Sequence, residues 1–217
     1  MPVPDHVIFG PDNSSGRFTY GEVRAMAQFD QHHALKGRMD TFFIAQVKEL
    51  AKSDDDSRKV YAPFPLFLLT CVGIETLGKV LYRPKKMNDE DAQREGFLEV
   101  TGKFGQKFSR PLSKQDKKNY DVLWGDDEHK KVKSIAHLIY RFGRHTMVHG
   151  FRGKGVYLTE GIPDWESSDG AITLNPYWFW STFKETYDNS WKEFFASKEP
   201  TCALKRSANQ YLDELLK

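Results

Sequence analysis

Apolar residues recur at steps of three and four along most of the chain, which is the spacing that buries one face of a helix. Between residues 64 and 82, for example, Leu66, Leu69 and Val72 share such a face. The pattern predicts helices over residues 19–52, 64–82, 88–104, 130–149, 175–196 and 200–216. The expected fold class is therefore all-α, with the helices packed as a bundle.

Local sequence signals support several of these helix ends. Thr19 and Glu22 have the spacing of a capping box, in which each side chain bonds a free backbone N–H at a helix start. Asn175 followed by Pro176 is a good cap with proline in the first turn. Gly150 stands where the helix over residues 130–149 would stop.

Two parts of the chain depart from the helical pattern. Residues 1–18 are rich in Pro, Gly, Asn and Ser, and they are expected to form an irregular arm. Residues 155–159 and 171–174 are short β-type runs, which predicts a small hairpin before the C-terminal helices. The expected organisation is an arm at 1–18, a helical bundle at 19–154, and a hairpin with C-terminal helices packed on the bundle at 155–217.

Composition narrows the class of protein. A chain of 217 residues is about one domain, and it can bury a core without disulfides or metals. Its two cysteines, Cys71 and Cys202, lack metal-site spacing and are expected to be reduced thiols of a cytoplasmic protein. No targeting signal is evident, and the apolar run Phe64–Val72 is shorter than the ~20 residues that cross a bilayer.

The net charge of +2 excludes a protein coated with positive charge, but this charge is unevenly distributed. The 26 residues from His129 to Lys154 contain seven Lys or Arg and four His, without any Asp or Glu. The other 191 residues carry 25 basic and 30 acidic groups, for a net charge of −5. This segment is either a solvated basic helix end or an anion site, most plausibly for phosphate.

Within this basic segment, Arg144 and His149 are separated by four residues at the expected end of a helix, and the polar His145 follows the arginine. Arg-x4-6-His with a polar residue after the Arg is the motif of HEPN domains, a superfamily of all-helical ribonucleases and related proteins. The segment therefore resembles a HEPN motif. The earlier helix with Glu75 is similar to the HEPN helix that carries an acidic residue facing the site, and the resemblance covers residues 20–150.

The resemblance implies a metal-independent endoribonuclease in which Arg144 and His149 are catalytic. His145, Arg141 and Glu75 would support them, with Glu75 orienting Arg144. The basic residues expected to bind phosphate or RNA are Lys130, Lys131, Lys133, Arg152 and Lys154. The resemblance also implies a homodimer, no cofactor and no metal, and a toxin or antiviral defence setting with a neutralising partner protein.

The expected chemistry uses the 2′-OH of RNA as the nucleophile and leaves a 2′,3′-cyclic phosphate. A histidine titrates near neutrality and can act as base or acid, whereas an arginine offers a fixed fork of donors to phosphate oxygens. On an ideal helix Arg144 and His149 point about 140° apart, so the helix must loosen or end before His149. His137, Arg141, His145 and His149 instead follow four-residue steps and form a ridge, so Arg141 is expected to assist.

Two other interpretations remain open. His145 and His149 stand four residues apart as metal ligands can, but the segment lacks the Glu of an HExxH motif. The protein could also be a non-enzymatic helical module that binds nucleotide, RNA or a partner protein through the same basic patch.

Overall fold

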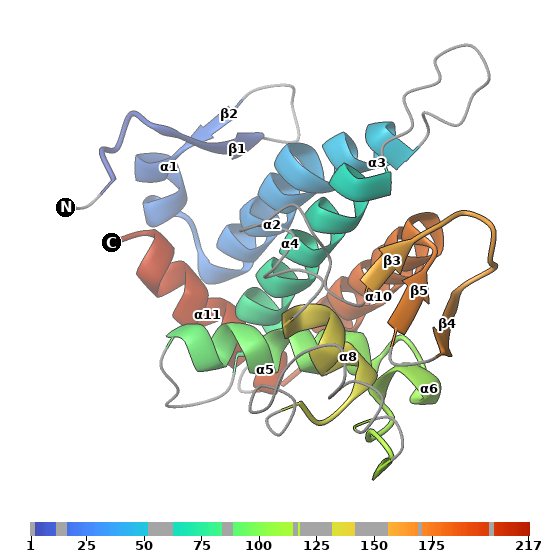
Figure 1. Ribbon diagram of the computed structural model, residues 1–217. Helices are drawn as coiled ribbons and strands as arrows, with labels where there is room; N and C mark the ends of the chain where they lie inside the picture. The colour runs from blue at the N-terminus through green and yellow to red at the C-terminus, as the bar shows by residue number, and fades with distance from the viewer. Residues whose placement is uncertain are drawn as a thin grey trace.

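The computed structural model describes residues 3–11, 17–51, 63–83, 89–114, 117, 132–141, 156–168, 171–199 and 202–217 (Figure 1). Helices contain 69% of these residues, and two small sheets lie at the edges of the helical body. The expectation of a mainly helical protein is therefore confirmed.

Helix α4 (Pro63–Leu81) forms the centre of the fold. It packs against the helices α3 (Ala45–Ala51), α5 (Asp89–Gly102), α10 (Pro176–Ala196) and α11 (Ala203–Leu215) (Figure 1). The helix predicted at 64–82 is thus confirmed. Its almost wholly apolar sequence is stable because these neighbouring helices cover it.

The face predicted for this helix is partly wrong. Leu69 and Val72 are 37% and 40% exposed, whereas Phe67, Cys71 and Ile74 are fully buried. A helix surrounded by neighbours is apolar on most of its circumference, so periodicity alone does not say which stripe remains outside.

Two glycines of α4 allow its close packing. A Cβ atom added at Gly78 would lie 2.4 Å from the carbonyl carbon of Gly96, so α4 and α5 cross with their backbones in contact. A Cβ atom at Gly73 would lie 2.5 Å from the ring of Phe43 and 2.8 Å from the ring of Phe183. Both positions exclude larger side chains, and they fix the distances between α4 and its neighbours.

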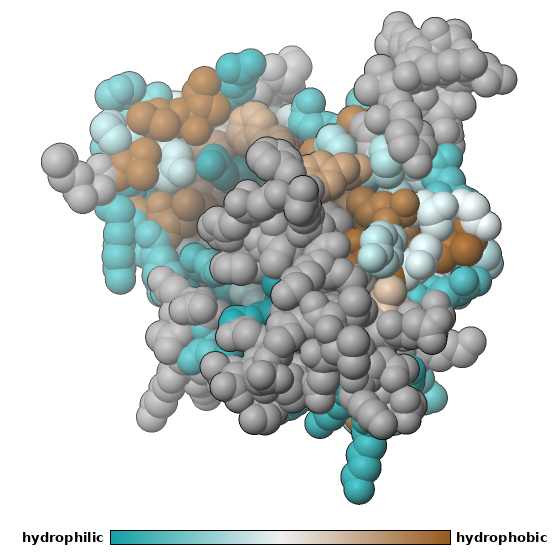
Figure 2. All heavy atoms as spheres, viewed as in Figure 1, coloured by the Kyte–Doolittle hydropathy of each residue, from teal (hydrophilic) through white to brown (hydrophobic). Residues whose placement is uncertain are grey.

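The N-terminal residues are more ordered than expected. Strands β1 (Ile8–Pro11) and β2 (Arg17–Thr19) pair antiparallel where an irregular arm was predicted. Phe9 is fully buried and meets Tyr20 edge to face at 5.2 Å between ring centroids, which gives this hairpin an apolar anchor. Val7 beside it is 37% exposed, and Figure 2 shows apolar surface over this hairpin.

The capping box is confirmed at the start of α1 (Tyr20–Ala25), where Thr19 and Glu22 exchange bonds with each other's backbone N–H at 2.7 and 3.3 Å. Arg24 of this helix joins the two ends of the described chain. Its guanidinium donates to the carbonyls of Val3 and Leu216, each at 2.7 Å, and pairs with Asp5.

The single helix predicted at 19–52 is divided. Met26 and Ala27 are extended and separate α1 from α2 (Gln28–Met39). A π-helical turn, Asp40–Ile44, then leads into α3. Gln31 bridges the break by donating to the Val23 carbonyl at 3.0 Å, which supplies from a side chain a bond that a continuous helix would make itself.

The predicted hairpin is only partly correct. Strands β3 (Val156–Leu158) and β5 (Ala171–Leu174) do pair, but they run parallel. A third strand, β4 (Trp165–Ser168), pairs antiparallel with β5 and gives the order β3-β5-β4 (Figure 1). The missed feature was the sequence Asp169–Gly170 between β4 and β5, a dipeptide typical of two-residue hairpin turns.

The cap predicted for α10 is confirmed. The Asn175 side-chain oxygen accepts from the N–H groups of Tyr177 and Trp178 at 2.9 and 3.2 Å, and its amide donates to the Ile162 carbonyl at 2.8 Å. The last helix, α11, begins at Ala203, three residues later than predicted. Pro200, predicted to start this helix, lies outside the described residues, and Cys202 occupies the N-cap.

The basic helix predicted at 130–149 also begins later. Val132 and Lys133 are not helical, and α8 (Ile135–Leu138) starts after Ser134, whose hydroxyl accepts from the His137 N–H at 3.2 Å. The residues just before α8 pair with another segment of the chain. Ser134 forms an isolated antiparallel β-bridge with Pro111, and the Leu112 N–H donates to the Lys133 carbonyl at 3.0 Å. The predicted apolar stripe is confirmed where it is described, since Val132, Ile135 and Ile139 are buried.

Candidate functional site

A cleft of 390 Å³ lies between α5 and the start of the basic segment. Its described lining consists of Arg94, Glu95 and Leu98 from α5, with Lys133, His137, Tyr140 and Arg141 from α8 and its flanks. We call it the α5–α8 cleft. It contains three cations and one carboxylate, so its described walls are positively charged.

The local fold explains why these side chains converge. On α8 and the residues after it, His137, Tyr140 and Arg141 are three and four residues apart and therefore share a face. The opposite face, with Ile135 and Ile139, is buried. The backbone bonds to Pro111 and Leu112 hold Lys133 at the start of the same face.

His137 is the buried polar group of the cleft, with an exposed fraction of 8%. Its Nδ1 atom accepts from the Lys133 backbone N–H at 3.4 Å, which places the proton of the neutral ring on Nε2. Burial lowers the pKa of His137, and the nearby charges of Arg94, Arg141 and Lys133 lower it further against the opposing effect of Glu95. At neutral pH the ring is therefore uncharged and offers an Nε2–H donor.

The cations of the cleft differ in how they are compensated. Arg94 pairs with Asp91 at 2.9 Å and with Glu95 at 3.2 Å. The ammonium of Lys133 is exposed and has no ion pair with any residue in the described part of the chain. A bound anion would compensate this charge, because phosphate groups favour convergent cations with N–H donors.

The structure brings together two of the predicted site residues, Lys133 and Arg141, in the α5–α8 cleft. Glu75 lies in α4, is 9% exposed, and does not belong to the described lining of the cleft. The remaining predicted residues lie outside the described residues: Lys130, Lys131, Arg144, His145, His149, Arg152 and Lys154.

Five residues of the cleft were not among the predicted site residues: Arg94, Glu95, Leu98, His137 and Tyr140. His137 had a usable signal, since it begins the four-residue ridge that continues through Arg141. Tyr140 and Arg94 had none. Arg94 reaches the cleft from a different helix, and the sequence does not state which face of α5 turns toward α8.

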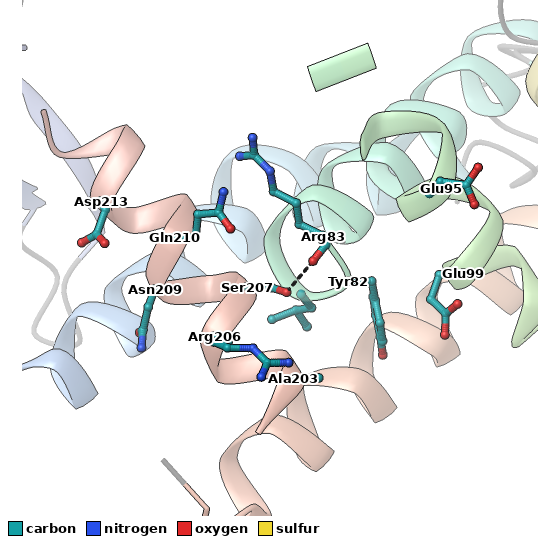
Figure 3. A pocket seen from close by; sticks show the side chains of 11 residues that line it. Tyr82, Arg83, Glu95, Glu99, Ala203, Arg206, Ser207, Asn209, Gln210 and Asp213 are labelled. Atoms are coloured by element: carbon teal, nitrogen blue, oxygen red, sulfur yellow. Dashed lines mark hydrogen bonds between the residues drawn. The ribbon is translucent and has the colours of Figure 1, made fainter. Parts of the chain in front are cut away.

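A second, larger cavity of 600 Å³ lies between the end of α4, α5 and α11 (Figure 3). Its charges are mixed, because the carboxylates of Glu95, Glu99 and Asp213 line it together with the guanidinium groups of Arg83 and Arg206 (Figure 3). None of the predicted site residues lines it.

Polar contacts hold the walls of this cavity in place. Ser207 donates to the Arg83 carbonyl at 3.2 Å, and Arg83 pairs with Glu214 at 2.6 Å. The Tyr82 hydroxyl donates to Ser190 at 2.7 Å. The mixture of charges gives it no preference for anions, in contrast to the α5–α8 cleft.

The two adjacent histidines of α2 have structural surroundings. His32 is buried and shares a hydrogen bond of 2.7 Å with Asn209, whereas His33 is exposed and stacks on Phe195. The two adjacent rings therefore point to different sides of α2. Within the described ranges no three His, Cys, Asp or Glu side chains gather as metal ligands would.

One described helix, α4, is long and apolar enough to cross a membrane by length and composition alone. In the fold, 61% of its apolar window is buried against neighbouring elements, which is the situation of a core helix.

The sequence matches no protein-family model, and neither a curated protein nor a solved structure matches it. Function must therefore be inferred from the residues and the geometry of this chain.

Proposed function

We propose that this protein is a metal-independent endoribonuclease of the HEPN type, which cleaves RNA by attack of the 2′-OH on the adjacent phosphate. The observation that carries the proposal is the α5–α8 cleft. It gathers Arg94, Lys133 and Arg141 around a buried histidine, and the Arg144–His149 motif begins three residues after Arg141. A positively charged cleft that is followed in the sequence by such a motif suits a polyanionic substrate.

The proposed division of roles follows from the chemistry of the side chains. Arg144 donates to the non-bridging oxygens of the scissile phosphate as negative charge develops on them. His149 removes the proton of the 2′-OH or protonates the leaving 5′-oxygen. Because one histidine cannot do both at once, a homodimer that brings two motifs to a two-fold axis would complete the acid–base pair.

Glu75 is the proposed positioning residue for Arg144. It is a buried carboxylate in the mainly apolar α4, and such a group is costly unless it bonds or pairs with another. Pairing with an arginine of the motif would repay this cost and would orient the guanidinium toward phosphate.

The test is cleavage of single-stranded RNA in EDTA. The parent protein should cleave and leave 2′,3′-cyclic phosphate ends, and Arg144→Ala and His149→Ala should each lower the rate by about 100-fold or more. Lys192→Ala, at an exposed position of α10, is the matched control and should cleave as the parent does. Equal rates in all four proteins, or cleavage that EDTA abolishes, would contradict the proposal.

A non-enzymatic module that binds nucleotide, RNA or a partner protein is the second candidate. It is favoured by the α5–α8 cleft itself, whose cations and neutral imidazole donor form a complete anion-binding set without an acid–base pair. RNA binding by the parent protein without any cleavage would select this function.

A further inference from the structure

We propose that the α5–α8 cleft binds one nucleotide of the RNA, with its phosphate held by Arg94, Lys133 and His137 and its base packed on Tyr140 and Leu98. This inference rests on the proposed function in taking the nucleotide to be part of an RNA chain. It adds a binding subsite beyond the Arg144–His149 motif, built from two helices that are far apart in the sequence.

The phosphate end of the cleft is defined by charge and by a directed donor. Among the described residues, nothing bonds the Nε2 atom of His137, although the ring is 8% exposed and lines the cleft. The neutral ring therefore offers an Nε2–H donor at the wall of the cleft. The ammonium of Lys133 and the guanidinium of Arg94 border the same space, so an acceptor with negative charge fits best.

Arg94 is prepared for this role by its neighbours. Its contacts with Asp91 and Glu95 are surface ion pairs, and each partner remains more than one-third exposed. Such pairs hold the guanidinium in place but are weak, and a phosphate can therefore share its donors.

The base end is defined by an aromatic ring with support behind it. Tyr140 is half-buried, lines the cleft, and packs on Phe97 at 5.1 Å between ring centroids. Phe97 is fully buried, and its contact restricts the tyrosine ring, which lowers the entropy lost when a base binds. An aromatic face with Leu98 beside it accepts any base by stacking.

Size and charge distinguish this cleft from the larger cavity beside α11. Its 390 Å³ lies within the roughly 300–1,000 Å³ typical of small-molecule sites. The α11 cavity is lined by three carboxylates and two guanidinium groups, so a phosphate gains no net attraction there.

The first experiment is calorimetric titration of the full chain with adenosine 5′-monophosphate, inorganic phosphate and adenosine. None of these probes is an RNA chain, so binding is measured without cleavage. The monophosphate should bind about tenfold tighter than either fragment, because it uses both ends of the cleft. Equal affinity for inorganic phosphate and the monophosphate would overturn the inference, as would absence of binding.

Variants assign the binding to the cleft. Lys133→Gln and Arg94→Gln should each weaken monophosphate binding by about tenfold, and Lys192→Gln on α10 should leave it unchanged. Tyr140→Leu should remove the advantage of the monophosphate over inorganic phosphate. An unchanged affinity in both Lys133→Gln and Arg94→Gln would overturn the inference.

His137 has a separate readout that does not depend on activity. A bound phosphate next to its ring should raise the pKa of His137, which NMR of the ring protons measures with and without the monophosphate. His137→Gln, which keeps an N–H donor, should bind better than His137→Leu, and thermal unfolding verifies that both are folded. An unchanged pKa in the presence of saturating monophosphate would contradict the assigned contact.

Failure of this inference and failure of the proposed function give different results. Monophosphate binding without RNA cleavage would support the subsite and overturn the ribonuclease. Cleavage that depends on Arg144 and His149, with no monophosphate binding and a normal rate in Lys133→Gln, would support the ribonuclease and overturn the subsite.

Discussion

The two sides of helix α5 differ in how closely they pack against the rest of the protein. On one side Gly96 touches the backbone of α4, and Phe97 and Val100 are fully buried. On the other side Arg94 and Leu98, four residues apart, line an open cleft. Each of these residues is two positions from Gly96, so at about 100° per residue it lies about 200° around the helix from the glycine.

The difference shows how a small helical protein can keep a polar cleft in one shape. The side that lines the cleft is left partly exposed and gains little stability from packing. Its position is set by the other side, where no side chain intervenes between Gly96 and Gly78. A closely packed crossing cannot shift without a clash or a void, so the cleft wall is held without using its own residues.

The largest expected effect comes from separating the two backbones. Gly78→Ala places a Cβ atom 2.4 Å from the Gly96 carbonyl carbon, and backbone cannot move aside as a flexible side chain can. We expect a loss of about 3 kcal/mol in the free energy of unfolding, at the upper end for overpacked cores. For a chain of this size this corresponds to about 6–12 °C in Tm, measured by thermal unfolding.

Gly102→Ala is the matched control on the same pair of helices. Nothing lies within 4 Å of a Cβ atom added at Gly102, at the end of α5. Alanine is the better helix former, so this variant should be unchanged or more stable by about 0.5 kcal/mol. A similar loss in both variants would show that the crossing of Gly78 and Gly96 is not what fixes α5.

A smaller loss in the free energy of unfolding is expected at acidic pH, and it comes from His137 in the α5–α8 cleft. The pKa of His137 is lowered by burial and by the cations of the cleft, so below about pH 6.5 the unfolded chain binds a proton that the folded protein does not. The stability that the neutral His137 contributes is therefore present above about pH 6.5 and is lost as the pH falls through the lowered pKa of His137. Urea unfolding at pH 7.5 and 5.5 should show a smaller acid loss in His137→Gln than in the parent protein.

The exposed His33 supplies the comparison for this measurement. His33→Gln removes an imidazole of the same chemistry that stacks on Phe195 at the surface. The change lies outside the α5–α8 cleft, so it should leave in place the acid loss that His137 causes. If His137→Gln and His33→Gln behave alike, the burial of His137 beside cations does not contribute to the acid sensitivity.

The smallest effect is expected for Arg94→Gln. The ion pairs of Arg94 with Asp91 and Glu95 are more than one-third exposed and are screened by solvent, so their loss should change the free energy of unfolding by less than about 0.5 kcal/mol. Chemical denaturation measures this change. A loss of 2 kcal/mol or more would contradict the division of α5 into a stabilising side and a functional side.

Sequence reasoning succeeded where the determinants are local. The capping box of Thr19 and Glu22 and the cap at Asn175 were predicted correctly, because each motif satisfies backbone groups within three residues of itself. The extent of α4 was also predicted correctly, since a long apolar run bounded by prolines has few alternatives.

It failed where distant segments compete for the same residues. Residues 132–134 were expected to be helical, but they bond to Pro111 and Leu112 instead. The pairing of β3 with β5 was predicted with the wrong direction, because β4 takes the hairpin position beside β5. Both outcomes depend on tertiary pairing, which hydrophobic periodicity does not encode.

The candidate site, too, could be predicted only in part from the sequence. Lys133 and Arg141 could be predicted as members of one basic group, because both lie in the acid-free segment. Arg94 lies in an acidic helix with Asp91 and Glu95 as neighbours, and its sequence context indicates an ordinary surface ion pair. Only the packing of α5 on α8 places it among the cations of the cleft.

The contact between Arg24 and the Leu216 carbonyl spans 192 positions of the chain, and His32 meets Asn209 across 177. A ribosome that adds about 5–20 residues per second needs roughly ten seconds or more to supply those partners. During that interval the nascent α2 lacks the contacts that α11 supplies, such as the one between His32 and Asn209. Chaperone occupancy of stalled nascent chains should therefore persist until the codons of α11 have been translated.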